Sequence, residues 1–171
     1  MSIILRPLRQ EDIAALDTAF LAQGWPSRAE LFERYLKEVS RGERQVMVAE
    51  LDGQPAGYVT LVPRSPAGPF AIFAGKDIPE IVDFNVLECF QRRGVGKALL
   101  DEIERLAAQL CDQVCIGVGL HAGYGAAQRM YVKRGFIPDG SGVWYGGKPV
   151  TPYEKEYPID DELALYFSKK L

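Results

Sequence analysis

The chain has 171 residues, of which 47% are hydrophobic and 25% are charged, as in an ordinary soluble globular protein. This length predicts one domain over residues 1–171 with room for a substantial core. The net charge of −3 argues against general nucleic-acid binding, and the apolar stretches are too short to predict a membrane span.

Cysteine and histidine usage indicates neither a disulfide framework nor a metal site. The three cysteines, Cys89, Cys111 and Cys115, are an odd number without framework spacing. One histidine is present, and the Cys111–Cys115 pair has no second ligand pair beside it. We therefore expect a reducing, cytoplasmic location, no bound metal and no signal peptide.

Apolar periodicity in the first part of the chain predicts helices and strands together. The expected elements are a strand at Ser2–Leu8, a helix at Gln10–Ala22, a helix from Ser27 to about Arg41, and strands at Gln45–Leu51 and Ala56–Val62. Ser27 is the expected cap of the second helix, with Glu30 at the capping-box position. Asp52-Gly53 is a hairpin signal between the two strands.

The second part continues the mixed pattern after a loop rich in proline and glycine. The expected elements are a short strand at Phe70–Phe73, a strand at Glu80–Leu87, a helix at Gly94–Leu110, a strand at Val114–Val118, a helix at Gly125–Arg134, strands at Phe136–Pro138 and Val143–Tyr145 joined by a turn at Asp139–Gly142, and a helix at Asp160–Ser168. Hairpins together with strand–helix–strand units predict an α+β, or mixed α/β, protein.

The segment between the predicted strand at Glu80–Leu87 and the next helix carries the strongest functional signal. Its turn reads Gln91-Arg92-Arg93-Gly94-Val95-Gly96. The N-terminus of a helix exposes unpaired N–H groups and the positive end of the helix dipole, so this turn suits a phosphate. Two arginines add positive charge, and the pattern points to a ligand with a pyrophosphate.

Two other phosphate-binding loops were weighed. A Walker A loop fails, because Gln91 stands at its first glycine position and Ala98 stands at its Ser/Thr position. The letters of a dinucleotide fingerprint occur at Gly117–Ala122, and Asp139 lies near the expected acidic offset. An NAD-dependent oxidoreductase using Gly117–Ala122 is therefore an alternative, although little chain follows to build the required unit.

The turn has the form Q/R-x-x-G-x-G/A and resembles the acyl-CoA pyrophosphate loop of the GNAT superfamily of N-acetyltransferases. A second segment, from Ala126 to Phe136, is similar to the A-x-x-x-Y-x-x-x-G-F segment of that family. The opening Ile4-Leu5-Arg6-Pro7-Leu8 is also similar to its first strand. The resemblance runs from about Ile3 to Trp144 and leaves residues 148–171 as an extension outside it.

The resemblance implies a mixed, largely antiparallel sheet flanked by helices and splayed between its fourth and fifth strands, where the acyl-CoA arm lies. It implies acetyl-CoA as co-substrate, with no metal. The residues it places at the cofactor are Val86, Leu87, Gln91, Arg92, Arg93, Gly94, Val95, Gly96, Lys97 and Tyr124. Tyr124 departs from the family pattern, which often has asparagine at that position.

Tyr131 matches the motif tyrosine that protonates the departing thiolate in this family. Glu80 and Asp83 are alternative general bases, and their odd separation puts them on opposite faces of an extended strand unless a bulge intervenes. Glu80 is slightly favoured because it starts the strand and should reach solvent. His121 and Cys89 are weaker candidates for a catalytic role.

The function implied is transfer of an acetyl group from acetyl-CoA to a primary amine of a small molecule or protein. A non-catalytic acyl-CoA-binding regulatory module remains an alternative beside the NAD-dependent one. Acidic residues around Glu80 and Asp83 hint at a cationic acceptor. We expect no nucleic-acid or membrane partner, and a homodimer is compatible with the sequence.

Overall fold

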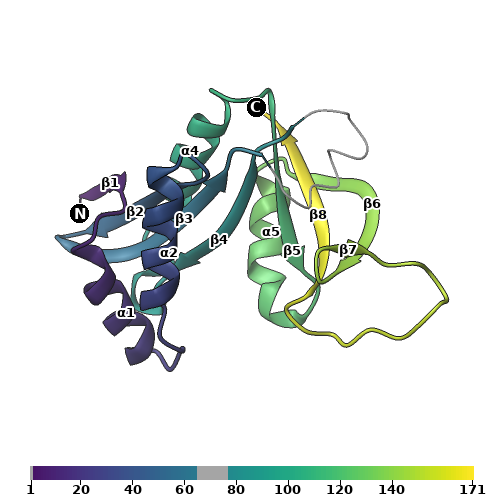
Figure 1. Cartoon of the computed structure of the whole chain (residues 1–171), viewed down its shortest axis with the longest axis horizontal. Coiled ribbons are helices and arrows are strands. Elements are labelled where there is room, and N and C mark those ends of the chain that lie inside the picture. Colours follow the sequence, from purple (N-terminus) through teal and green to yellow (C-terminus); the bar gives the residue numbers. More distant parts are fainter. Residues whose placement is uncertain (1, 65–76) are drawn as a thin grey trace. The chain divides into compact units, whose positions relative to one another are not determined.

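The structure, a computed structural model, describes residues 2–64 and 77–171 (Figure 1). The short strand expected at Phe70–Phe73 lies outside these ranges. The chain divides into two compact units: unit 1 comprises Met1–Pro63 and Ile81–Ala107, and unit 2 comprises Arg64–Glu80 and Ala108–Leu171. The expectation of one domain over the whole chain remains a prediction.

Unit 1 is a set of adjacent strands with helices packed on them. Its elements are β1 (Ile3–Pro7), α1 (Asp12–Ala22), α2 (Ala29–Ser40), β2 (Gln45–Leu51), β3 (Gln54–Val62), β4 (Glu80–Val86, of which Glu80 belongs to unit 2), the 3-10 turn η1 (Glu88–Phe90) and α4 (Val95–Ala107). The strand order is β1-β2-β3-β4. The β1–β2 and β2–β3 pairs are antiparallel, with Leu5 opposite Ala49 and Val48 opposite Tyr58.

Helices cover both faces of these strands. Figure 1 shows α1 and α2 on one face and α4 on the other. Phe20 of α1 and Phe32 of α2 are fully buried against Tyr58 of β3. Burial of each such aromatic ring contributes roughly 1.5–3 kcal/mol, so this cluster fixes α1 and α2 on the sheet.

Two local expectations for unit 1 have clear outcomes. The Asp52-Gly53 hairpin is confirmed, because both residues have positive φ, 52° and 82°, as the favoured two-residue turn requires. The capping of α2 by Ser27 is confirmed in part: Ser27 Oγ accepts from Ala29 N at 3.4 Å, but the N-cap residue is Arg28. The shorter hydrogen bonds from the start of α2 go to Asp17 of α1, whose Oδ1 lies 2.5 Å from Arg28 N and 3.0 Å from Ala29 N.

Unit 2 is a second antiparallel set of strands with one helix. Its elements are β5 (Gln113–Gly119), the 3-10 turn η2 (Ala122–Tyr124), α5 (Gly125–Lys133), β6 (Ile137–Tyr145), β7 (Lys148–Pro149) and β8 (Leu163–Lys170). The strand order is β5-β8-β6-β7. β8 is therefore central, with Ile116 opposite Phe167 on one side and Val143 opposite Leu165 on the other.

The expected helix at Asp160–Ser168 is wrong, because this segment contains strand β8. Hydrogen-bonding partners on both sides, β5 and β6, override the local helical pattern. The two strands expected at Phe136–Pro138 and Val143–Tyr145 are one strand, β6, with a register shift between Pro138 and Val143. The predicted turn is thus a bulge within a strand.

Antiparallel strands with packed helices make up both units. The α+β fold class and its largely antiparallel pairing are therefore confirmed. None of the helices in the described ranges combines the length and the apolar character that a membrane span needs.

Candidate active site

The turn between β4 and α4 has the geometry of an anion site. Arg92 and Gly94 have left-handed backbone, with φ of 58° and 88°. The first hydrogen bond that enters α4 runs from Ala98 N to Gly94 O, at 3.0 Å. Within the described part of the chain, no acceptor takes the N–H groups from Arg92 to Gly96. These donors gather at the positive end of the α4 dipole.

The two glycines of this turn serve different purposes. Gly94 holds a positive φ of 88°, which a residue with a side chain adopts only with strain. A Cβ atom on Gly96 would lie 3.3 Å from Phe84 Cζ and 3.5 Å from Val86 Cγ2. Gly96 therefore lets the start of α4 approach β4 closely, and the helix N-terminus stays beside the strand.

The charged side chains around the turn are partly committed to the protein itself. Arg93 lies 3.6 Å from Asp52 and over the Phe90 ring, and Lys97 pairs with Asp101 at 2.6 Å. Arg92 is exposed, and no described residue pairs with it. Of the two arginines, Arg92 is thus the cation that remains available to a phosphate.

The other predicted cofactor residues of this region lie just before the turn. Gln91 Nε2 donates to Val86 O at 3.2 Å. Leu87 N donates to Ala56 O at 3.0 Å, and the Leu87 side chain is buried in the core of unit 1. Val86 O and Leu87 N therefore already have partners within the protein. An acyl-CoA arm can hydrogen bond only to the other backbone groups of these two residues unless it displaces those partners.

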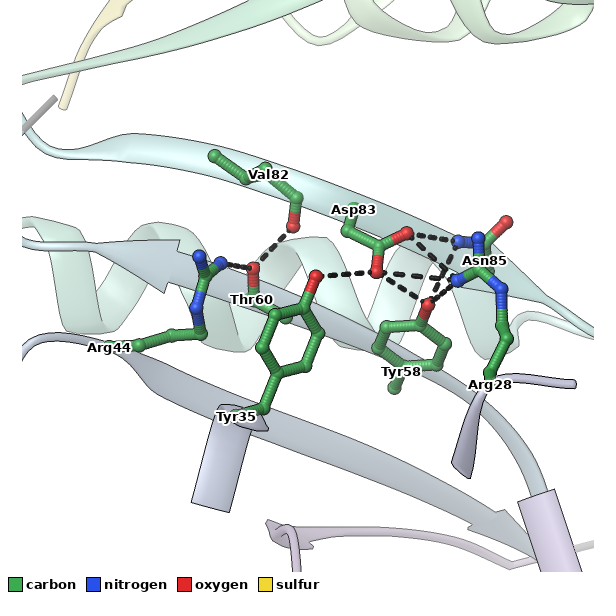
Figure 2. Close-up of polar contacts among 8 residues, drawn as sticks. All are labelled: Arg28, Tyr35, Arg44, Tyr58, Thr60, Val82, Asp83 and Asn85. Carbon is green, nitrogen blue, oxygen red and sulfur yellow. Dashed lines mark hydrogen bonds and ion pairs between the residues drawn. The ribbon is translucent and has the colours of Figure 1, made fainter. Parts of the chain in front are cut away.

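A polar network that the sequence did not reveal surrounds Asp83 on β4 (Figure 2). Tyr35 and Tyr58 donate to Asp83 Oδ2 at 2.8 and 2.7 Å, and Asn85 Nδ2 donates to Oδ1 at 2.8 Å. Arg28 Nη1 lies 3.1 and 3.3 Å from the two carboxylate oxygens and also donates to the Tyr58 hydroxyl. Four side chains from α2, β3, β4 and the residue before α2 therefore hold this carboxylate.

The electrostatics of the network follow from its burial. Burial, and next the charge of Asp83, raises the pKa of Tyr58 and of Tyr35 well above the usual value. Burial by itself would lower the pKa of Arg28, but its interactions with Tyr58 and Asp83 outweigh that effect and raise it. At neutral pH both tyrosines are donors and Arg28 is charged, so the Asp83 carboxylate is saturated with donors.

A sequence signal for this network did exist. Tyr35 falls on the apolar face of its helix and Tyr58 falls within a strand, and buried tyrosine hydroxyls usually find a polar partner. Sequence alone could not indicate that Arg28 and Asp83, 55 positions apart, complete the set. Asp83 also has a positive φ of 53°, a rare conformation for aspartate within a strand.

Glu80 belongs to unit 2 and lies in a different environment. Only 8% of the residue is exposed, so the expectation that it reaches solvent is wrong. Burial, followed by the charge of Glu80, raises the pKa of Cys115 and of Tyr166. The Glu80 carboxylate is therefore near a thiol and a phenol in the interior of unit 2.

Tyr131 lies on α5, packed edge-on against Phe136 with ring centroids 5.8 Å apart. Burial, and then Tyr124, raises its pKa. No described residue hydrogen bonds to its hydroxyl. Although only 5% of the residue is exposed, the hydroxyl is not among the fully buried polar atoms that lack a partner in the described ranges, so it keeps some contact with solvent. A protonated, accessible phenol is what a general acid requires.

Tyr124 and His121 form a small cluster at the end of β5. Tyr124 Oη donates to Asp161 Oδ1 at 3.1 Å, and His121 Nε2 lies 2.8 Å from the same oxygen. Gly123 N donates to His121 Nδ1 at 3.1 Å, so His121 caps η2. Both ring nitrogens therefore have partners, and the imidazole is engaged in structure.

The glycines of the dinucleotide-like Gly117–Ala122 segment are explained by packing. A Cβ atom on Gly119 would lie 2.5 Å from the Tyr124 ring, and one on Gly117 would lie 3.4 Å from the Tyr166 ring. The strand that precedes them pairs antiparallel with β8. The glycines make room for these two rings, so they need no nucleotide to account for them.

Other candidate chemistry finds little support. All three cysteines are free, and Cys89 is exposed. In the portion of the chain that is described, no three His, Cys, Asp or Glu side chains cluster so as to hold a metal ion.

Comparison with known proteins identifies the family. The sequence model of the acetyltransferase (GNAT) family matches residues 11–136, well over half of the chain. No curated protein sequence matches the chain significantly. The chain belongs to the GNAT family of acetyltransferases, so the family resemblance and the acyltransferase class are confirmed.

Solved structures with low sequence identity share the fold over nearly the whole chain. An N-acetyltransferase from Staphylococcus aureus has a TM-score of 0.70 at 16% identity and covers 99% of both chains. A ribosomal-protein-alanine N-acetyltransferase from Brucella melitensis has a TM-score of 0.67 at 21% identity, over 98% of this chain and 99% of its own. Arabidopsis thaliana NAA60, solved with acetyl-CoA, has a TM-score of 0.69 at 18% identity over 99% of both chains.

Proposed function

We propose that this protein transfers an acetyl group from acetyl-CoA to a primary amine of a small molecule or a protein. The observation that carries the proposal is the row of N–H groups from Arg92 to Gly96 without a described acceptor, beside the exposed Arg92. Such a turn binds a pyrophosphate through backbone donors and one mobile cation. It would hold the CoA end of acetyl-CoA.

The reaction needs few groups beyond correct positioning. The neutral amine nitrogen forms a bond to the thioester carbonyl carbon and the carbon–sulfur bond breaks. The nitrogen loses one proton to a base, which leaves the amide, and the sulfur takes one proton, which leaves the thiol. We assign the proton that the sulfur takes to Tyr131, whose pKa is raised by burial and whose hydroxyl keeps some contact with solvent. The phenol is protonated at neutral pH, so its hydroxyl can donate to the sulfur as negative charge develops there.

For the proton of the amine we favour Glu80 over Asp83. Asp83 accepts from four side chains, so both of its carboxylate oxygens already have hydrogen-bond donors from the protein. Glu80, whose carboxylate lies near Cys115 and Tyr166 in unit 2, could take the proton directly or through a water. Asp83 then becomes a positioning residue.

The test is thermal unfolding with saturating acetyl-CoA, CoA or NAD, followed by a screen of amines for thiol release. A ligand that binds only the folded state raises the unfolding midpoint. We expect a rise with acetyl-CoA and CoA, none with NAD, and turnover with at least one amine. A rise with acetyl-CoA but no turnover with any amine would favour the non-catalytic binding module, and a rise with NAD alone would reject the proposal.

We also propose a cytoplasmic location, supported by the three free cysteines. Fractionation of cells that express the protein tests this. A homodimer is a further prediction, which sedimentation can check.

A further inference from the structure

The side chain of Arg28 occupies an unusual position in unit 1. Its guanidinium carbon lies 5.1 Å from the Phe20 ring centroid, 5.3 Å from the Trp25 centroid and 6.0 Å from the Tyr58 centroid. Figure 2 shows the guanidinium directed toward Asp83 and the Tyr58 hydroxyl. Three aromatic rings and one carboxylate therefore fix the plane of this cation.

Only one nitrogen of the guanidinium, Nη1, takes part in the described hydrogen bonds of this side chain, which go to Tyr58 and Asp83. No described residue accepts from Nε or Nη2 of Arg28. In the described ranges, Asp139 Oδ2 is the one side-chain polar atom that is both fully buried and without a partner. Nε and Nη2 of Arg28 have no described partner, so they are not fully buried and keep some exposure to solvent.

These two nitrogens form the edge of arginine that pairs with carboxylates in a parallel, two-bond geometry. The same chain shows this pairing elsewhere. Arg105 donates from Nε to Glu102 Oε2 at 2.9 Å and from Nη2 to Glu102 Oε1 at 2.7 Å. Arg28 presents the same edge without a described carboxylate on it.

The open edge is also held in place before any ligand arrives. The backbone N–H of Arg28 donates to Asp17 Oδ1 at 2.5 Å, and its Nη1 is tied to Asp83. The side chain is 20% exposed. A cation that is already ordered loses little conformational entropy on binding, so its pairing with an anion is more favourable than that of a mobile surface arginine.

We propose that the Nε/Nη2 edge of Arg28 binds a carboxylate of the amine acceptor. The acceptor is then an amino carboxylate, such as a free amino acid, and Arg28 determines specificity. This inference rests on the proposed acetyl transfer and deepens it. It also replaces the cationic acceptor suggested by the acidic residues around Asp83, because the Asp83 carboxylate is paired with Arg28.

The test compares matched acceptors that differ only in the carboxylate. Rates are measured for free amino acids, for the corresponding amino acid amides, and for short peptides with and without an acidic side chain. We expect wild-type kcat/KM to favour the carboxylate over the amide by about 10- to 100-fold, the range of a charge-assisted hydrogen-bonded pair. A preference confined to acidic peptides would assign the carboxylate to a side chain of a peptide acceptor.

Arg28→Gln should abolish the preference for carboxylates by raising the KM for free amino acids. The KM for amino acid amides should change little, and the KM for acetyl-CoA should not change. Arg28→Lys should restore part of the preference, since lysine keeps the charge but lacks the two-bond edge. Arg105→Gln is the matched control, because it removes an arginine of the same unit that already has its carboxylate. If the wild type acetylates free amino acids and their amides with equal kcat/KM, the proposal is overturned by that measurement alone.

A measurement that needs no turnover separates this inference from the proposed function. N-acetyl amino acids are the expected products, and they should raise the unfolding midpoint of the wild type but not that of Arg28→Gln, whereas their amides should raise neither. No shift with any N-acetyl amino acid, in a protein that acetyl-CoA does stabilise, would reject the role of Arg28 and leave the acetyl transfer intact.

Discussion

Tyr131 carries the sharpest prediction for a single residue. Tyr131→Phe should reduce kcat by roughly 10²-fold or more, the usual effect of removing a general acid. The ring stays packed against Phe136, so the unfolding midpoint and the affinity for acetyl-CoA should change little. Steady-state kinetics with the best amine, together with titration of acetyl-CoA, checks this. An unchanged kcat would remove Tyr131 from the mechanism.

Asp83 is expected to act on stability and positioning. Asp83→Asn removes the charge that Arg28 faces and leaves that partly buried cation without its counter-ion. The expected cost is about 1–3 kcal/mol in the free energy of unfolding. Glu43→Gln, which breaks the exposed pair with Arg41, is the control and should cost less than about 1 kcal/mol. Urea unfolding of the two variants compares them, and equal costs would contradict the role of the network.

Among the individual site residues, those that belong to a short sequence motif could be predicted from the sequence. The turn from Gln91 to Gly96 and the helix that bears Tyr131 lie where expected. The partners of Asp83 were missed, since Tyr35 and Tyr58 look like core aromatics until the fold brings their hydroxyls to one carboxylate. Contacts between residues far apart in sequence leave no short motif to detect.

At the scale of the element, the start of α4 can be tested through Gly94. Gly94→Ala leaves space for the new Cβ, whose nearest neighbour is Ile3 Cδ1 at 3.7 Å, but the φ of 88° becomes strained. The expected cost is about 1–2 kcal/mol, with weaker acetyl-CoA binding as the N–H groups shift. Isothermal titration measures the affinity.

Gly42→Ala is the matched control for Gly94→Ala. Gly42 also has a positive φ, 71°, and open space around it, yet it lies between α2 and β2. It should show a similar loss of stability with no change in acetyl-CoA affinity. If both variants bind acetyl-CoA as tightly as the wild type, the turn is not the pyrophosphate site.

Strand β8 offers a second test of an element. Leu165 lies opposite Val118 of β5 and Val143 of β6. Leu165→Pro removes one backbone donor from a strand paired on both sides, at a cost of about 3 kcal/mol or more. Leu165→Val keeps the donor and should cost less than about 1.5 kcal/mol. Amide exchange within β5 and β6 should accelerate in the proline variant alone, and unchanged exchange would argue against the central place of β8.

Elements were predicted well where the local pattern and the tertiary partners agree. The helices α1, α2, α4 and α5 and the hairpin of β2 and β3 fall within a few residues of their expected bounds. β8 was mistaken for a helix because its partners come from β5 and β6, which lie far away in sequence. Non-local pairing cannot be read from the segment itself.

For the whole molecule, buried tyrosines predict the response to alkaline pH. Burial raises the pKa of four tyrosines in the two units: Tyr35, Tyr58, Tyr131 and Tyr166. Above about pH 10 the unfolded chain loses these protons and the folded chain keeps them. The unfolded state then binds fewer protons, so the free energy of unfolding falls as the pH rises further.

This loss should be absent below about pH 9 and should accompany the appearance of tyrosinate absorbance. Urea unfolding across that range, followed together with the absorbance, measures both. Ionisation of all the tyrosines while the protein remains folded would contradict the predicted environment of these side chains.

The strand order of unit 2 has a consequence for how the protein is made. β5 and β6 are synthesised before β8, yet β8 lies between them. Until Leu163–Lys170 emerges from the ribosome, the edges of β5 and β6 that will receive it have no partner, while the helices and hairpin of unit 1 up to Val62 can already form. Unpaired edges of this kind attract other chains. We therefore expect nascent unit 2 to be the part of this protein most prone to aggregate during synthesis, and slow translation between Tyr145 and Leu163 to lengthen the exposure of its unpaired strand edges.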